Sequence, residues 1–236
     1  MVVGNRILDL IFPKRCVVCD EITEQMGESV CGKCRKKIIY IKEPVCMKCG
    51  KQLKREEQEY CRDCEKRRHS YIRGTALYDY GSMADSIFRF KYAGRMEYAS
   101  FYGRDLYEKK TKWLSMVRPD AFLPVPVHPS RKRKRGYNQA ELIARELSEH
   151  SGIPVNTTLM ERVRKTQPLK NQTHGERQNN LKRAFKIRRN DVKLNTIVII
   201  DDIYTTGSTV DSMAQVLREV GITEIYFMAL TIGRGI

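Results

Sequence analysis

The sequence lacks any uninterrupted apolar stretch long enough to cross a membrane, and its first apolar segment is short and contains Arg6 and Asp9. A membrane-spanning helix needs about 20 apolar residues in succession, and a secretory leader needs an apolar centre without charges. We therefore expect neither a membrane-spanning nor a secreted protein. The predicted location is the cytoplasm, either free or in peripheral association with the inner face of the membrane.

Acidic residues are few, with 28 Asp and Glu against 44 Lys and Arg, for a net charge of +16. Residues 131–189 hold most of the surplus, with 16 basic against 5 acidic side chains, whereas residues 1–70 hold 16 against 11. A basic excess of this size suits a polyanionic partner, and its binding would depend strongly on salt. A solvated charged loop is the alternative, because basic runs often serve only solubility.

Cysteine is absent after residue 64, and the eight cysteines form four C-x-x-C pairs whose starts lie fifteen residues apart: Cys16 and Cys19, Cys31 and Cys34, Cys46 and Cys49, Cys61 and Cys64. Two-residue spacing lets both sulfurs of a pair face one tetrahedral ion, and two pairs complete a shell of four thiolates. We predict two structural zinc ions, bound by pairs consecutive in sequence, with an interleaved arrangement left open. Disulfides and a redox motif fit less well, since no leader is visible and no pair differs from the others.

The most informative segment is residues 197–210, IVIIDDIYTTGSTV. Its apolar, β-branched start predicts a strand buried on both faces of a parallel sheet. Asp201 and Asp202 follow, and their carboxylates can accept hydrogen bonds from a ribose diol. The next loop offers hydroxyl and N–H groups to a phosphate, and a helix should begin directly afterwards. The segment predicts a sugar-phosphate site, and the alternative is an ordinary strand-turn-helix junction.

The remaining pattern alternates strands and helices. We expect strands at residues 75–80, 121–127 and 224–231, and helices at residues 84–92, 98–110 and 138–150 and after residue 209. This order predicts an α/β fold with a doubly wound parallel sheet, whose ligands bind at the carboxyl ends of the strands. We assign residues 1–70 to a small zinc-ribbon module and residues 71–236 to the sheet domain.

Residues 197–210 closely resemble the phosphoribosyl pyrophosphate (PRPP) signature of type I phosphoribosyltransferases. The rest of the chain resembles one branch of that superfamily, the ComF-type competence proteins. The resemblance rests on the zinc module with Cys-Gly at residues 49–50, and on FKYAGR at 90–95, PVPVHP at 124–129, GYNQ at 136–139 and GERQNN at 175–180. It implies a role in natural transformation, in which such proteins handle incoming single-stranded DNA alongside a ComFA-type helicase.

The resemblance also implies roles for particular residues. Asp201 and Asp202 would hold the ribose of PRPP, which binds with magnesium. The 5′-phosphate would lie on Thr205, Thr206, Gly207, Ser208 and Thr209. The loop after residue 127 would hold the pyrophosphate through Arg131, Lys132 and Arg133, and Arg177 would approach the diphosphate from a mobile catalytic loop.

The DNA surface and the acceptor are less defined. We assign DNA contacts to Lys134, Arg135, Arg164 and Lys165, and consider Tyr92, Tyr137 and Tyr204 as base-stacking residues, with packing as the alternative. No hood domain for an acceptor is recognisable, so the sequence leaves open whether the chain is an enzyme. Two alternative hypotheses are a nucleotide-salvage phosphoribosyltransferase with an unidentified acceptor, and a zinc-ribbon adaptor that docks a helicase and has a vestigial sugar-phosphate site.

Overall fold

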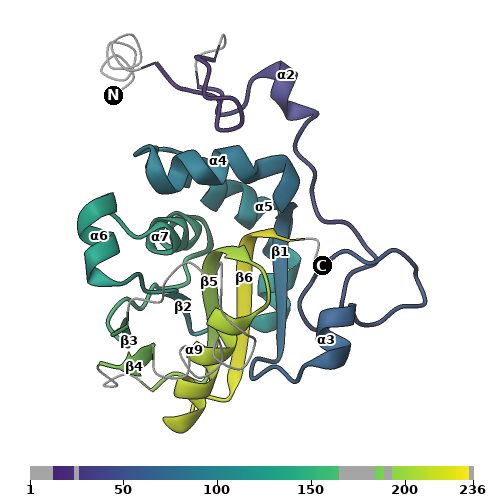
Figure 1. Cartoon of the computed structure of the whole chain (residues 1–236), viewed down its shortest axis with the longest axis vertical. Coiled ribbons are helices and arrows are strands. Elements are labelled where there is room, and N and C mark those ends of the chain that lie inside the picture. Colours follow the sequence, from purple (N-terminus) through teal and green to yellow (C-terminus); the bar gives the residue numbers. More distant parts are fainter. Residues whose placement is uncertain (1–12, 24–26, 165–183, 189–192, 234–236) are drawn as a thin grey trace.

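A central parallel sheet organises the molecule. The computed structural model describes residues 13–23, 27–164, 184–188 and 193–233. Within them the sheet consists of β1 (Arg73–Asp79), β2 (Ala121–Pro124), β5 (Thr196–Tyr204) and β6 (Glu224–Ile232), in the order β1-β6-β5-β2 (Figure 1). All three pairings are parallel. The carboxyl ends of the strands therefore meet at one edge, where β5 presents the two aspartates.

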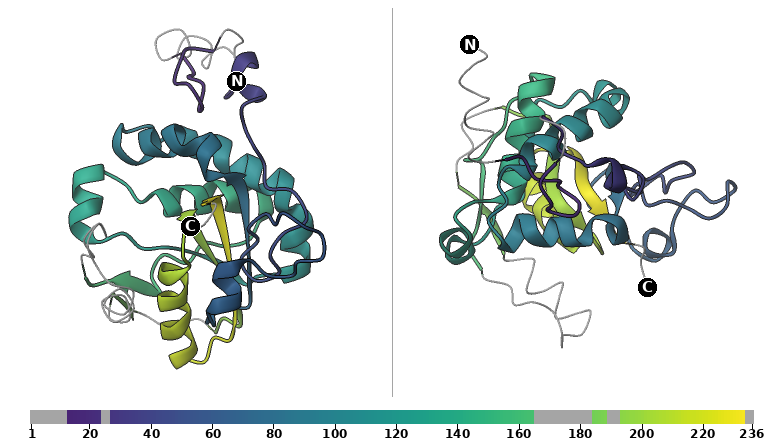
Figure 2. Two further views of the ribbon diagram at one scale, coloured as in Figure 1. Left: turned by 45° about the vertical axis from the view of Figure 1, so that its right-hand side comes forward. Right: turned by 90° about the horizontal axis from the view of Figure 1, so that it is seen from above.

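Helices cover both faces of this sheet. Alternate side chains of a strand point to opposite faces, so Ile197 and Ile199 pack on one side and Val198 and Ile200 on the other. Helix α9 (Ser208–Glu219) covers the first face. Helices α4 (Tyr80–Tyr92), α5 (Tyr98–Val117) and α7 (Gln139–Ser151) cover the second (Figure 2). The predicted α/β fold with a parallel sheet is confirmed.

The predicted loop after β2 is wrong, because the basic run forms helix α6 (Pro129–Arg135). Strand β2 ends at Pro124 rather than at residue 127, and Pro126 has no N–H group for a further ladder bond. His128 Nδ1 then accepts a hydrogen bond from the Ser130 N–H at 3.2 Å and caps the helix. Pro129 stands at the first helical position, and Gly136 closes the helix with a φ of 87°.

The signature strand is longer than predicted. It continues beyond residue 200 because Asp201 pairs with Ala229, and Tyr204 with Ile232, along β6. The two aspartates thus lie within the carboxyl end of β5 rather than beyond it. The sequence analysis also missed an antiparallel pair, β3 (Met160–Arg162) and β4 (Phe185–Ile187), because three-residue strands are too short to show a period.

The cysteine-rich segment forms two ribbons that dock separately. The first contains α2 (Gly32–Arg35) and packs against α4 and α5, where Asp20 accepts from Tyr98 Oη and pairs with Arg95, both at 2.7 Å. The second contains α3 (Arg62–Lys66) and packs on β1, where the Gly74 N–H donates to the Lys48 carbonyl at 2.8 Å. Figure 1 shows them well apart, above the sheet and beside β1. The domain boundary at residue 70 stays a prediction.

In the described part of the chain, no helix combines the length and apolar character that crossing a membrane requires.

Candidate functional site

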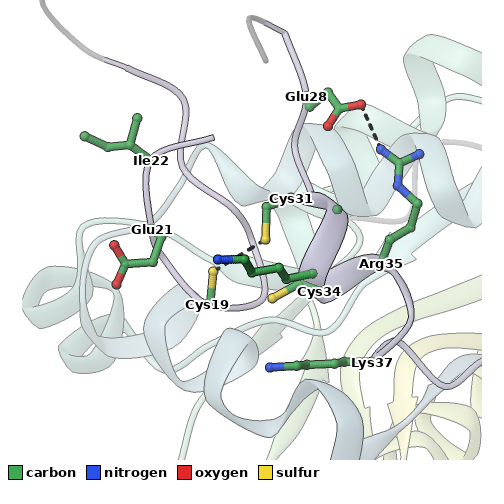
Figure 3. Close-up of a pocket in the computed structure, with 10 residues that line it drawn as sticks. Cys19, Glu21, Ile22, Glu28, Cys31, Cys34, Arg35 and Lys37 are labelled. Carbon is green, nitrogen blue, oxygen red and sulfur yellow. Dashed lines mark hydrogen bonds and ion pairs between the residues drawn. The ribbon is translucent and has the colours of Figure 1, made fainter. Parts of the chain in front are cut away.

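The eight cysteines form two clusters in sequence order, Cys16, Cys19, Cys31 and Cys34 in the first ribbon and Cys46, Cys49, Cys61 and Cys64 in the second. Within each cluster the four sulfurs lie within 4.8 Å of one another. The sulfurs of Cys19 and Cys31 are 3.9 Å apart, and those of Cys49 and Cys61 are 3.7 Å apart. Zinc–sulfur bonds of about 2.3 Å in a tetrahedron place sulfurs about 3.8 Å apart. Both clusters therefore fit zinc, and Figure 3 shows three cysteines of the first cluster, Cys19, Cys31 and Cys34, converging beside α2.

The same local turn builds both clusters. After the first cysteine of each ribbon the chain turns back, so that the Asp20 N–H donates to the Cys16 carbonyl and the Gly50 N–H to the Cys46 carbonyl, both at 2.8 Å. Hydrogen bonds among the four sulfurs of the second cluster lower the pKa of Cys46 and raise the pKa of Cys49. A divalent cation at the centre of the cluster would instead hold all four groups as thiolates.

The second ribbon is attached to the start of α9. Asp211, in the first turn of α9, accepts from the Ser70 N–H at 2.8 Å and bonds His69 Nδ1 at 2.7 Å. The hydroxyl groups of Tyr71 and Tyr204 are 2.6 Å apart. The His69 side chain is almost completely buried, and its Nε2 atom has no hydrogen-bond partner among the described residues. The segment that leaves the second zinc cluster therefore supports the loop assigned to the 5′-phosphate.

The two aspartates differ in their surroundings. Lys91 of α4 places its Nζ atom 2.9 Å from Oδ1 of Asp202, and the Thr231 hydroxyl donates to the Asp202 carbonyl at 3.1 Å. Burial, followed by repulsion from the Asp202 carboxylate, raises the pKa of Asp201 to about 8. A carboxyl group paired with a lysine and one whose pKa is raised thus lie side by side at the carboxyl end of β5.

The loop between β5 and α9 has the features of an anion site. Gly207 adopts a φ of 78° at the N-cap of α9, and no side chain within the described ranges caps this helix. The first N–H groups of the helix are therefore open to an anion, which the helix dipole also favours. The hydroxyl groups of Thr206 and Ser208 are 2.8 Å apart, and Thr205 is exposed. Thr209 lies in the first turn, so all five predicted phosphate residues lie together.

Helix α6 places the predicted pyrophosphate residues beside this edge, with Lys132 and Arg133 exposed and Arg131 half-buried. Arg162 of β3, which the sequence analysis missed, interacts electrostatically with Arg131 and Asp201, and burial lowers its pKa. A pocket between α6 and β3 is lined by Lys132, Arg162 and Arg188, among others. Lys91 was also missed as a site residue, although it belongs to the FKYAGR segment.

The remaining predicted residues have different outcomes. Arg177 and Lys165 lie outside the described residues, while Arg164 is exposed just after β3. Tyr137 donates a hydrogen bond to the Phe90 carbonyl and is buried. Tyr204 is buried as well and stacks on Phe227 at a centroid distance of 4.4 Å. These two tyrosines are packing residues, and Tyr92 is exposed.

Comparisons with known proteins agree with this architecture. A family model described as a double zinc ribbon domain matches residues 7–65, and one described as a phosphoribosyl transferase domain matches residues 133–234. Competence protein F of Haemophilus influenzae is 33% identical over 151 residues, which cover 61% of this chain and 65% of the relative. Competence protein ComFC of Bacillus subtilis is 30% identical over 153 residues, which cover 62% and 58%.

A third relative, the DNA utilization protein YhgH of Escherichia coli, is 32% identical over 149 residues, which cover 61% of this chain and 64% of the relative. The matches thus span somewhat less than two thirds of these relatives' own lengths. The chain therefore combines a double zinc ribbon domain with a phosphoribosyl transferase domain, and it is similar to competence proteins F and ComFC.

Proposed function

We propose that this chain binds PRPP with magnesium at the carboxyl edge of its sheet and handles single-stranded DNA beside that site during DNA uptake. The observation that supports this most strongly is a juxtaposition. The paired aspartates of β5, the uncapped start of α9 and the basic helix α6 all lie at one edge, where parallel α/β sheets bind their ligands.

Each group has a chemical role in this proposal. The ribose hydroxyls donate to Asp202, whose Oδ1 atom lies 2.9 Å from the Lys91 ammonium group. The 5′-phosphate accepts from the first N–H groups of α9 and from the hydroxyls of residues 205–209. The diphosphate lies towards Arg131 and Arg162, whose guanidinium groups complement its charge. Magnesium, when bound with PRPP, would neutralise part of that charge.

The DNA part of the proposal rests on charge and on the relatives. Residues 131–189 carry a net charge of +11, from 16 basic and 5 acidic side chains, and Arg133 and Lys134 of α6 are exposed. The relatives are named for competence and for DNA utilization. A ComFA-type helicase at the inner face of the membrane is the partner we propose for this chain.

Calorimetry with PRPP and magnesium tests the small-ligand site. Asp202→Ala removes a charge-assisted acceptor worth about 1.5–3 kcal/mol, so we expect affinity to fall about 10- to 150-fold. Asp85→Ala, an exposed acid on α4, is the matched control and should leave the affinity unchanged. Unchanged affinity in both Asp201→Ala and Asp202→Ala would make these carboxylates structural residues of β5.

Fluorescence anisotropy with single-stranded oligonucleotides over a range of salt concentrations tests the DNA site. Neutralising Arg131, Lys132 and Arg133 together should weaken binding to all sequences about equally. The slope of log affinity against log salt should flatten by ~0.7 for each phosphate group that the variant no longer neutralises. PRPP should compete with DNA at this helix. An undiminished DNA affinity in the triple variant would move the DNA surface away from α6.

The salvage hypothesis makes a separate prediction. A transferase consumes PRPP and releases pyrophosphate in the presence of its acceptor, whereas a PRPP-binding DNA-handling protein need not. Pyrophosphate release measured against a panel of free bases and amines therefore distinguishes the two. Turnover with one acceptor would favour salvage.

A further inference from the structure

Helix α4 exposes two aromatic rings that contribute nothing to the core. Its inner face buries Met83, Ile87 and Phe90 against the sheet. On its outer face Phe88 and Tyr92, four residues apart, are 61% and 66% exposed, with ring centroids 5.1 Å apart. The two ring planes are inclined at 48°, and together they form an exposed apolar surface of the kind that commonly serves as an interaction site.

A cation completes this surface. The Arg135 guanidinium of α6 lies 4.9 Å from the centroid of the Tyr92 ring, and its Nη1 atom also donates to Gln139 Oε1. Arg135 is thus held over the ring by a second contact. Arg133 and Lys134, one turn or less away on α6, are exposed. The surface therefore combines planar apolar rings with several positive charges.

This combination selects single-stranded nucleic acid as the occupant. Aromatic rings stack on bases of any sequence, and neighbouring cations bind the phosphates between them. An apolar patch for a protein partner would not need the run of five basic residues that α6 supplies. Duplex DNA fits less well, because its bases are already stacked on one another.

The surface also adjoins the sugar-phosphate edge. Lys91, the residue before Tyr92, bonds Asp202 at 2.9 Å. A strand whose base stacks at Tyr92 would therefore pass beside the proposed PRPP site. We propose that Phe88, Tyr92 and Arg135 form a base-stacking platform that holds single-stranded DNA at the entrance of this site. This inference rests on the proposed function and names the DNA contacts within it.

The test uses a fluorescein-labelled 20-nucleotide oligothymidine and the full chain with zinc. Tyr92→Ala and Phe88→Ala should each weaken binding about 5- to 150-fold, the range expected when one base no longer stacks. The slope against salt should stay the same, because no charge is removed. Tyr92→Phe should bind like the parent chain. Tyr60→Ala, which removes a 40% exposed tyrosine from the second ribbon, is the matched control and should have no effect.

An abasic oligomer of the same length separates stacking from phosphate binding. The parent chain should bind it at least as weakly as Tyr92→Ala binds oligothymidine, and Tyr92→Ala should bind it no more weakly than the parent. Affinity for PRPP should be the same in the parent chain and in Tyr92→Ala, so a failure of the platform is distinguishable from a failure of the PRPP site. Thymidine monophosphate that competes as strongly as the oligomer would identify a mononucleotide site instead and overturn the DNA assignment.

Two further results would overturn the proposal. The first is equal affinity for oligothymidine in the parent chain and both alanine variants, which would leave these rings for a protein partner. The second is a parent chain that does not bind oligothymidine, which would remove the proposed DNA function and the platform together. Both side chains are exposed, so unchanged thermal unfolding of the variants is expected and excludes misfolding as the cause.

Discussion

Gly74→Ala should destabilise the protein through one contact between neighbouring strands. Gly74 of β1 pairs with Phe227 of β6, and an added Cβ atom would lie 1.9 Å from Cε1 of that ring. The ring is fully buried, with Tyr204 stacked on it at 4.4 Å and the edge of Tyr71 at 5.0 Å. Backbone of the second ribbon covers the other side, because Gly50 approaches Gly74 closely.

The size of the effect follows from this confinement. Overpacking typically costs about 1–3 kcal/mol, and the upper end applies where the displaced ring has no free space. A destabilisation of about 3 kcal/mol should lower the melting temperature by about 6–12 °C in a chain of this length. Circular dichroism at a fixed zinc concentration measures it, since free metal also shifts the transition. Gly32→Ala is the control, because its Cβ would meet nothing within 4 Å.

A double variant tests the assigned cause. Phe227→Leu shortens the side chain that collides, so Gly74→Ala combined with Phe227→Leu should be less destabilised than the sum of the two single variants. A coupling of about 1–2 kcal/mol is expected for residues in contact. A melting temperature within about 2 °C of the parent for Gly74→Ala, or strict additivity in the cycle, would refute the reasoning.

Three further predictions concern the metals, the acid pair and the ribbon attachment. Elemental analysis should find two zinc ions per chain and about one in Cys46→Ser, because the clusters are separate; near-zero zinc in the parent would contradict this. The pKa of Asp201 is raised from 3.8 to about 8, so the folded state favours the protonated carboxyl group. This stabilisation is full below pH 3.8 and is lost as the pH rises through about 8. Asp201→Asn should flatten denaturant midpoints between these pH values, and an unchanged profile would show that Asp201 titrates normally. Asp211→Ala removes two hydrogen bonds, to His69 and Ser70, and should lower the free energy of unfolding by about 2–4 kcal/mol. Glu219→Ala, which removes an exposed acid from the same helix, is the control and should change the unfolding midpoint little. Equal midpoints in both variants would contradict the attachment.

Much of this architecture follows from local patterns in the sequence. The C-x-x-C spacing determines that two cysteines face one ion, and their sequence-order clustering agrees with the pairing predicted from it. The β-branched run before Asp201 specifies a buried strand, and the glycine and hydroxyl residues that follow specify a turn into a helix. These features depend on contacts within a few residues, so spacing and residue type determine them.

Other features depended on residues far apart in the chain. Lys91 meets Asp202, and Arg162 interacts electrostatically with Asp201, only because folding brings α4 and β3 to the carboxyl edge of β5. The tertiary structure decided that Tyr204 is buried while Tyr92 is exposed, because burial depends on the elements that pack around each ring. It also attached the first ribbon to α4 and α5 and the second to β1, since burial is set by the neighbours that folding brings together and not by the residue itself.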